Sequence, residues 1–342
     1  MTRPGGWIRR WLQADGALHV ATLAIILGWG CWLRLVHLDL PMRHDEVSTF
    51  FQYVSRPLAE TLYRYDLQNN HVLHTLLMRG SWRLFGDSPA ALRLPALVAG
   101  ILSMPAAYVV ARKLYGREAA LLTVGLAAAG SELIKYSTNA RGYSLVMLLS
   151  LLLVAVADAL RRDPTPTRWA LFVACTALGV WSVASMLYAL AGVLLWLILS
   201  VIRNDVATPR WRFAFQLAAA TAVAAGLVLL LYSPVLMWGD VGSLARVYGG
   251  RVRAWSDFWA RHARSIARLW SDWHLGVPTA LVPLIPGLTF LGLLDRHRLA
   301  TARVPAILAI GLTPVAVVLA QRVSVFPRIW SYLLPLYLTL VA

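Results

Sequence analysis

Cysteine, lysine and acidic residues are all scarce in this chain of 342 residues. The two cysteines, Cys31 and Cys175, both lie in apolar runs, so the sequence offers neither a disulfide framework nor a cysteine metal site. Only Lys113 and Lys135 among the 32 basic residues are lysines, and 16 acidic residues leave a net charge of +16. Since no soluble basic domain is present to use that charge, nucleic acid is not an expected partner.

Motifs typical of soluble enzymes are also missing. The sequence has no glycine-rich phosphate loop, no nucleotide-binding fingerprint and no serine nucleophile elbow. This disfavours a cytosolic nucleotide-sugar site and favours an activated donor carried in the membrane. His71 and His74 have the i, i+3 spacing of a helical metal site, but no further histidine or cysteine at fixed spacing completes the set. We therefore expect no metal site and no cofactor, with structural histidines instead.

Long apolar runs dominate what is present. Hydrophobic residues make up 59% of the chain, and the mean hydropathy is +0.62. Because the backbone must satisfy its own hydrogen bonds in lipid, runs of about 20 apolar residues predict spanning helices. We expect one all-α polytopic membrane domain over residues 1–342. Its predicted spans are 17–36, 91–111, 118–136, 143–160, 168–185, 186–202, 212–237, 276–294, 304–320 and 330 to the end.

Short basic links between the spans predict the topology. Five links carry or border three basic residues each, and alternating spans place all five on one side. The positive-inside rule makes that side cytoplasmic. The last apolar stretch is short for a bilayer, so we expect the natural protein to continue past Ala342. The outer side then contains 37–90, 137–142, 238–275 and 321–329.

Two of the outer stretches have a helical pattern but lack the composition of spans. Residues 71–86 are few and carry two arginines one turn apart, which favours an interfacial helix. Residues 251–273 place tryptophans on one face and arginines, including Arg261 and Arg264, on the other. We expect this second helix to lie in the headgroup layer. Its arginines suit either a substrate phosphate or anionic lipid headgroups.

The stretch "RHDEV" places Asp45 and Glu46 side by side just after the first span. Adjacent carboxylates in an extended segment point in different directions, so one can act while a cation holds the other. A carboxylate near the membrane surface suits a general base, because partial desolvation makes it more basic. The alternative is a structural role at the start of a helix such as 47–63, where the helix dipole favours acids.

Two further arginines lie at the outer ends of spans. Arg141 and Tyr143 open one span, and Arg328 precedes another. Each arginine can bind a lipid-linked phosphate or simply extend to the headgroups. The predicted topology puts both on the same membrane face as Asp45, which indicates a site for an anionic lipid-linked substrate.

Taken together, these features resemble the GT-C superfamily of polytopic glycosyltransferases, specifically the bacterial family 39-like and dolichyl-phosphate-mannose-transferase-like enzymes. The resemblance covers most of the chain. It implies a GT-C-type bundle in which 48–64 and 71–86 form juxtamembrane helices of the first outer loop. It depends on the order and spacing of "HDE", "NNHVLHTLLMRGSWRLFGDSPAALRLPALVAG", "ARKLYGREAALL", "YSTNARGYSLVMLLSLLL" and "PRIWSYLLPLYL".

The resemblance implies an inverting glycosyltransferase that moves a sugar from a polyprenyl phosphate to a lipid, glycan or protein acceptor. It places the enzyme in a bacterial inner membrane with the active site on the periplasmic or extracellular face. By position, Asp45 is the expected base and Glu46 its acidic neighbour. Arg141, Tyr143 and Arg328 match positions that hold the donor phosphate or shape its cavity.

Three further residues are assigned to substrate binding, and one position departs from the family. His71 is retained from a His-Pro-Pro pattern whose prolines are replaced, and Arg261 and Arg264 add outer positive charge. Asn139 stands where many relatives have an acid. Two other functions stay open: a transporter or flippase for a lipid-linked anion, and a structural subunit of an envelope-polysaccharide assembly. A transporter predicts charges within spans and repeated halves, of which the sequence shows little.

Overall fold

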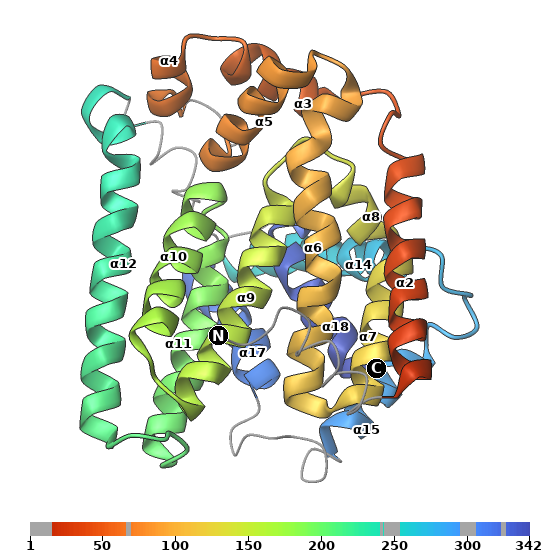
Figure 1. Ribbon diagram of the computed structural model, residues 1–342, viewed down its shortest axis with the longest axis vertical. Helices are drawn as coiled ribbons and strands as arrows, with labels where there is room; N and C mark the ends of the chain where they lie inside the picture. Colours follow the sequence, from red (N-terminus) through yellow and green to blue (C-terminus); the bar gives the residue numbers. More distant parts are fainter. Residues whose placement is uncertain (1–15, 66–69, 240–241, 243–253, 295–305, 323–325) are drawn as a thin grey trace.

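The protein is all helical across the residues that its structure, a computed structural model, describes. Those residues are 16–65, 70–239, 242, 254–294, 306–322 and 326–342. The long helices stand side by side, and a group of short helices covers one end of the bundle (Figure 1). The all-α class predicted from the sequence is therefore confirmed.

Four helices of the described residues are long and apolar enough to cross a membrane alone. They are α2 (Ala17–Val36), α6 (Pro89–Tyr115), α9 (Tyr143–Arg162) and α12 (Arg210–Trp238). Three shorter helices stand with them, namely α10 (Pro166–Ser182), α11 (Met186–Ile202) and α17 (Ala306–Gln321). Seven of the predicted spans thus correspond to single helices, including the closely spaced pair 168–185 and 186–202.

The core lies between the middle helices of the bundle. Phe172, Trp196 and Phe213, from α10, α11 and α12, are fully buried there together with apolar side chains of α6 and α9. At the edges, α2 and α12 bury only 17% of their most apolar windows. Apolar helices that remain exposed in the isolated chain suit contact with lipid.

The predicted span 118–136 is broken in the structure. Gly130 adopts an extended backbone conformation, so the helix stops and restarts there. The two pieces, α7 (Arg117–Ala129) and α8 (Ser131–Ser137), are bent by 61° relative to each other. Taken together, the two pieces are apolar enough for one span, which is why the sequence pattern predicted one straight helix.

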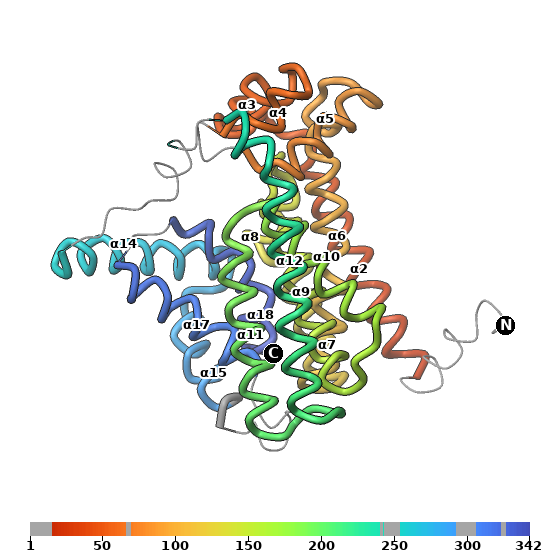
Figure 2. Tube along the Cα trace, turned by 90° about the vertical axis from the view of Figure 1, so that its left-hand side faces the viewer, coloured from red at the N-terminus to blue at the C-terminus, as the bar shows by residue number. Residues whose placement is uncertain are grey.

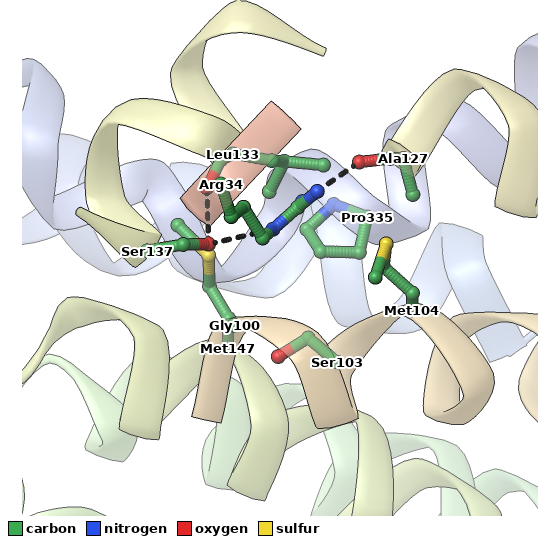
Figure 3. Close-up of a pocket in the computed structure, with 9 residues that line it drawn as sticks. All are labelled: Arg34, Gly100, Ser103, Met104, Ala127, Leu133, Ser137, Met147 and Pro335. Carbon is green, nitrogen blue, oxygen red and sulfur yellow. Dashed lines mark hydrogen bonds between the residues drawn. The ribbon is translucent and has the colours of Figure 1, made fainter. Parts of the chain in front are cut away.

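Arg34 of α2 stabilises this break. Its guanidinium donates to the carbonyl oxygens of Ala127 at 3.0 Å and Ala128 at 3.2 Å, and its Nε donates to Ser137 Oγ at 3.1 Å. Carbonyl groups freed at a helix end are costly to leave unpaired away from water. Arg34 also lines a cavity of about 10 Å³, which has room for no more than one water. Figure 3 shows the side chains around this cavity. The cavity is lined by Arg34, Gly100, Ser103, Met104, Ala127, Leu133, Ser137, Met147 and Pro335.

The predicted spans near the end of the chain are shorter than expected. Turns occupy much of 274–283, and α15 (Leu284–Leu294) begins only after Pro283. Proline disfavours the helical conformation of the residue before it, so Pro278 and Pro283 explain the delay. The final stretch forms a 3₁₀ helix, η2 (Pro327–Leu333), and then α18 (Leu334–Val341).

The first outer loop folds into short helices. They are α3 (His44–Thr49), the π-helical turn η1 (Phe50–Val54), α4 (Leu58–Tyr63) and α5 (Val72–Phe85). The expected helix over 48–64 is interrupted at Pro57, because proline disfavours a helical conformation at Arg56. The expected helix over 71–86 is present as α5.

The predicted amphipathic helix at 251–273 is present as α14 (Trp255–Trp273). Residues 251–253 of the prediction lie outside the described part of the chain. It runs crosswise to the upright helices and projects from the bundle (Figure 2). Its apolar side is split in two. Phe258 and His262 are buried against the protein, whereas Trp255 and Trp259 are about half exposed. The bundle therefore covers the part of the apolar face that carries Phe258 and His262 and leaves Trp255 and Trp259 partly exposed.

Candidate active site

The acid pair lies in the first turn of α3, so the structural interpretation of these residues holds in part. The helix begins at His44, three residues earlier than the sequence suggested. Arg43 is its N-cap, and the Arg43 N–H donates to Glu46 Oε2 at 2.8 Å. Acids in a first turn stabilise a helix through its dipole and its free N–H groups. Asp45 and Glu46 therefore share a helical turn but point to different surroundings.

Asp45 Oδ2 lies between two guanidinium groups. Arg141 Nη1 donates to it at 2.5 Å, and Arg328 Nη1 donates to it at 3.1 Å. The three residues come from α3, from the turn that precedes α9 and from η2. The Asp45 side chain is 41% exposed, whereas that of Arg141 is only 2% exposed. A carboxylate that solvent can reach is thus held by one buried and one partly exposed cation.

The aromatic and histidine side chains around Arg141 fix its position. The Arg141 guanidinium lies 5.4 Å from the centre of the Tyr143 ring, a cation–π distance. The Tyr143 ring in turn meets the His71 ring edge to face, with centroids 5.0 Å apart. His71 Nε2 lies 3.4 Å from Arg141 Nη2. All three predicted residues therefore belong to one packed group.

His71 is held in its neutral form. The Gly142 N–H donates to Nδ1 at 2.9 Å, so that nitrogen is an acceptor. Burial and the nearby charge of Arg141 keep the pKa of His71 well below its usual value. A neutral imidazole adds no positive charge for a phosphate. The structure thus places His71 as a link between the start of α5 and the turn that carries Arg141.

His74, one turn further along α5, is buried and also neutral. Burial and the charge of Arg141 lower its pKa from 6.5 to about 3, and neither ring nitrogen has a hydrogen-bond partner among the described residues. Within that part of the chain, no group of three or more His, Cys, Asp or Glu side chains is placed to hold a metal ion.

Glu46 is fully buried and occupied by protein donors. Arg93 of α6 donates to both of its oxygens at 2.8 Å, and the Ala140 N–H donates to Oε1 at 2.7 Å. Although burial raises the pKa of Glu46, these hydrogen bonds and the charge of Arg93 bring it below the usual value. Glu46 therefore stays ionised with no surface for a substrate, which argues against a catalytic role for it.

Sequence reasoning missed Arg93. The available signal was its position inside the apolar run 91–111, because an ionisable residue within a span is unusual and normally has a partner. The structure identifies that partner as Glu46.

The arginines of α14 lie apart from this group. Arg261 and Arg264 are exposed, and Arg264 Nε donates to the Ala260 carbonyl of its own helix. Among the described residues, no hydrogen bond or ion pair joins either arginine to Asp45 or Arg328. The helix does contact the neighbourhood of the site, since Phe258 packs with Ile329 and Trp330 of η2.

Comparison with known proteins gives a family match over the middle of the chain. The family described as dolichyl-phosphate-mannose-protein mannosyltransferase matches residues 71–238, which include His71, Arg93, Arg141 and Tyr143. No curated protein sequence matches the chain.

Solved structures show the same fold. ArnT from Cupriavidus metallidurans in the apo state matches with a TM-score of 0.64 and 14% identity, over 95% of this chain and 59% of that one. The oligosaccharyltransferase AglB from Archaeoglobus fulgidus, in complex with an inhibitory peptide and a dolichol-phosphate, matches with a TM-score of 0.58 and 14% identity. That match covers 97% of this chain and 50% of AglB. A complex of the Archaeoglobus fulgidus oligosaccharyltransferase with Zn and sulfate gives a TM-score of 0.60 at 14% identity, over 94% and 48% of the two chains.

The chain therefore spans between about half and three-fifths of the length of these proteins. The fold similarity extends over nearly all of it, and the family match covers the segment that includes Arg141. Together these findings show that the chain shares the fold of GT-C membrane glycosyltransferases and that its middle segment is similar to the mannosyltransferase family, in agreement with the resemblance seen in the sequence.

Proposed function

We propose that this protein transfers a sugar, with inversion, from a polyprenyl-phosphate donor to an acceptor at the outer face of a bacterial inner membrane. Asp45 is the general base in this proposal. The observation that carries it is the contact of Asp45 Oδ2 with both Arg141 and Arg328. An acceptor-activating group and two phosphate-binding groups thereby meet at one accessible point. The acceptor is a lipid, a glycan or a protein.

The charge of the group suits a phosphodiester. Two guanidinium charges against the Asp45 carboxylate leave one net positive charge, because His71 is neutral and Glu46 is matched by Arg93. A sugar linked through one phosphate carries a single negative charge. Guanidinium groups bind phosphate oxygens through several parallel hydrogen bonds, which sets orientation as well as affinity.

Asp45, Arg141 and Arg328 supply the groups that the proposed reaction needs. The acceptor oxygen attacks the anomeric carbon while its proton passes to Asp45, and the bond from that carbon to the phosphate oxygen breaks. The electron pair leaves with the phosphate, whose second negative charge is stabilised by Arg141 and Arg328. Asp45 Oδ2 is occupied by the arginines, so Oδ1 is the oxygen that takes the proton. Oδ1 lies 3.9 Å from Nδ1 of the exposed His44 ring.

The membrane itself is the second partner. Helix α14 exposes tryptophans on one face. Its opposite face carries Arg261, Arg264 and Arg268, which are also exposed. In a headgroup layer, the tryptophans reach the acyl chains and the arginines meet anionic lipid phosphates. We assign Arg261 and Arg264 to lipid binding, since the structure does not bring them to Asp45.

The test uses purified protein reconstituted in vesicles with labelled polyprenyl-phosphate hexoses and pentoses and a membrane extract as acceptor. Wild type should move label to acceptor, Asp45→Asn should abolish transfer, and Asp39→Asn, the same change at an exposed loop position, should leave it intact. Transfer by Asp45→Asn at the wild-type rate contradicts the assignment. Movement of labelled donor across the vesicle without transfer of its sugar indicates a flippase instead.

A further inference from the structure

The buried ion pair between Glu46 and Arg93 lies directly behind the candidate active site. Arg93 Nε donates to Glu46 Oε1 and Arg93 Nη2 donates to Oε2, both at 2.8 Å, and each side chain is at most 2% exposed. Taking two charges out of water offsets most of their attraction, so such a pair adds little net stability. Setting a unique geometry is the better physical reason for its presence.

Arg93 also holds the connection between α2 and α3. Its Nη1 donates to the carbonyl oxygens of Leu38 at 2.8 Å and Leu40 at 2.5 Å, and its Nη2 reaches the Pro41 carbonyl at 3.2 Å. The Arg93 side chain of α6 thus donates hydrogen bonds to three carbonyl groups and one carboxylate. Because this connection leads into α3, Arg93 determines where the first turn of α3 lies relative to α6.

Glu46 forms hydrogen bonds with the backbone on both sides of the site. Its Oε2 accepts from the Arg43 N–H at the start of α3, and its Oε1 accepts from the Ala140 N–H at 2.7 Å. Ala140 directly precedes Arg141 in the chain. The Glu46 carboxylate therefore connects the turn that carries Asp45 to the turn that carries Arg141.

These contacts close a ring. Asp45 is bonded in the chain to Glu46, the Glu46 side chain is hydrogen-bonded to Ala140, and the next residue, Arg141, donates back to Asp45. The geometry points to Glu46 and Arg93 as positioning residues that set the distance and direction of the Asp45 carboxylate relative to Arg141. This inference rests on the proposed function of Asp45, and it assigns neither residue a contact with substrate.

Two conservative variants test the role. Arg93→Lys keeps the charge but loses the two-pronged contact, and Glu46→Gln keeps the shape but replaces an acceptor oxygen by a donor. Arg79→Lys is the matched control. Arg79 likewise donates to two carbonyls of the first outer loop, those of Val54 and Arg56, but it has no connection to Ala140.

The first measurement is transfer by the reconstituted protein, expressed per folded molecule. Both variants should lower kcat at saturating donor by roughly 10- to 100-fold, the effect of misplacing a reacting group by about 1 Å. The KM for donor should change little, because Arg141 and Arg328 are still present. A lower thermal midpoint with unchanged kcat in Arg93→Lys indicates a purely structural role and overturns the inference. Arg79→Lys should keep the wild-type kcat.

The second measurement does not depend on activity. Spin labels at His44→Cys and Leu152→Cys, in a chain with Cys31→Ala and Cys175→Ala, report the distance from α3 to α9. Both labelled positions are exposed. The distance distribution should be narrow in the labelled protein without further substitution and in its Arg79→Lys variant. Arg93→Lys should broaden it. An unchanged distribution overturns the inference, whereas absence of transfer by wild type with the expected broadening overturns only the proposed function.

Discussion

The Asp45 carboxylate lies 2.5 Å from the guanidinium of Arg141, a residue 96 positions later in the chain. One partner of this pair is buried and the other is accessible, since Arg141 is 2% and Asp45 41% exposed. A buried cation that holds an accessible carboxylate presents it to a substrate in a fixed direction. Arg328, itself 31% exposed, completes the group from the open side.

Replacing Arg328 should weaken donor binding more than it weakens folding. Arg328→Gln removes a guanidinium that solvent can reach, so the fold keeps its buried contacts. A hydrogen bond to a charged group contributes about 1.5–3 kcal/mol, which corresponds to roughly 10- to 100-fold weaker donor binding. Titration of labelled donor into reconstituted protein measures this. Arg268→Gln, the same change at an exposed position of α14, should leave donor affinity near wild type. An equal loss of donor affinity in the two variants would show that donor binding depends only on the total positive charge of the outer face.

Acid should destabilise the protein through His74. Its pKa is lowered from 6.5 to about 3 in the folded state, so below pH 6.5 the unfolded chain binds more protons than the folded one. Stability should therefore fall as the pH drops from about 6.5 toward 3, by up to about 1.4 kcal/mol per pH unit for this group. Thermal unfolding in detergent between pH 7 and pH 4 measures the slope. His74→Leu should give a shallower slope, and His44→Gln, at an exposed position, should not. Parallel slopes in wild type and His74→Leu would exclude this histidine as the cause.

Gly100 should not tolerate a side chain, whereas Gly226 should. A methyl group at Gly100 would lie 2.0 Å from Ser137 Oγ, the atom that accepts a hydrogen bond from Arg34. Overpacking of this kind typically destabilises by about 1–3 kcal/mol. Gly226 has nothing within 4 Å of such a methyl group, so Gly226→Ala should stabilise α12 by about 0.5–1 kcal/mol. Thermal midpoints of the two variants should move in opposite directions, and an unchanged or raised midpoint in Gly100→Ala contradicts the packing described at Ser137.

Hydropathy and charge predicted which residues could meet. The positive-inside pattern assigns 37–90, 137–142 and 321–329 to one side, and this is enough to bring Asp45, Arg141 and Arg328 to the same end of the bundle. Their actual contact could not be read from the sequence, because it depends on how α3, the turn before α9 and η2 pack together. The fold class followed from the apolar runs alone.

What the sequence could not predict depends on long-range partners. The Glu46–Arg93 pair joins residues 47 positions apart, and only the packing of α3 against α6 shows which acid is buried and which is free. The break at Gly130 escaped the hydropathy pattern because the two pieces together are still apolar enough for a span, although Glu132 and Lys135 follow the glycine. On α14, Phe258 and Trp259 are equally apolar neighbours, and only contact with η2 and α17 shows that Phe258 is the buried one.

The most direct test of the account is a structure of the Asp45→Asn variant with a polyprenyl-phosphate sugar bound, determined by cryo-electron microscopy in lipid. Asparagine cannot take the acceptor proton, so the donor should remain intact. The account predicts density for the donor phosphate within hydrogen-bond distance of Arg141 and Arg328, with the anomeric carbon facing residue 45. Donor phosphate bound instead to the arginines of α14, or elsewhere away from residue 45, would contradict it.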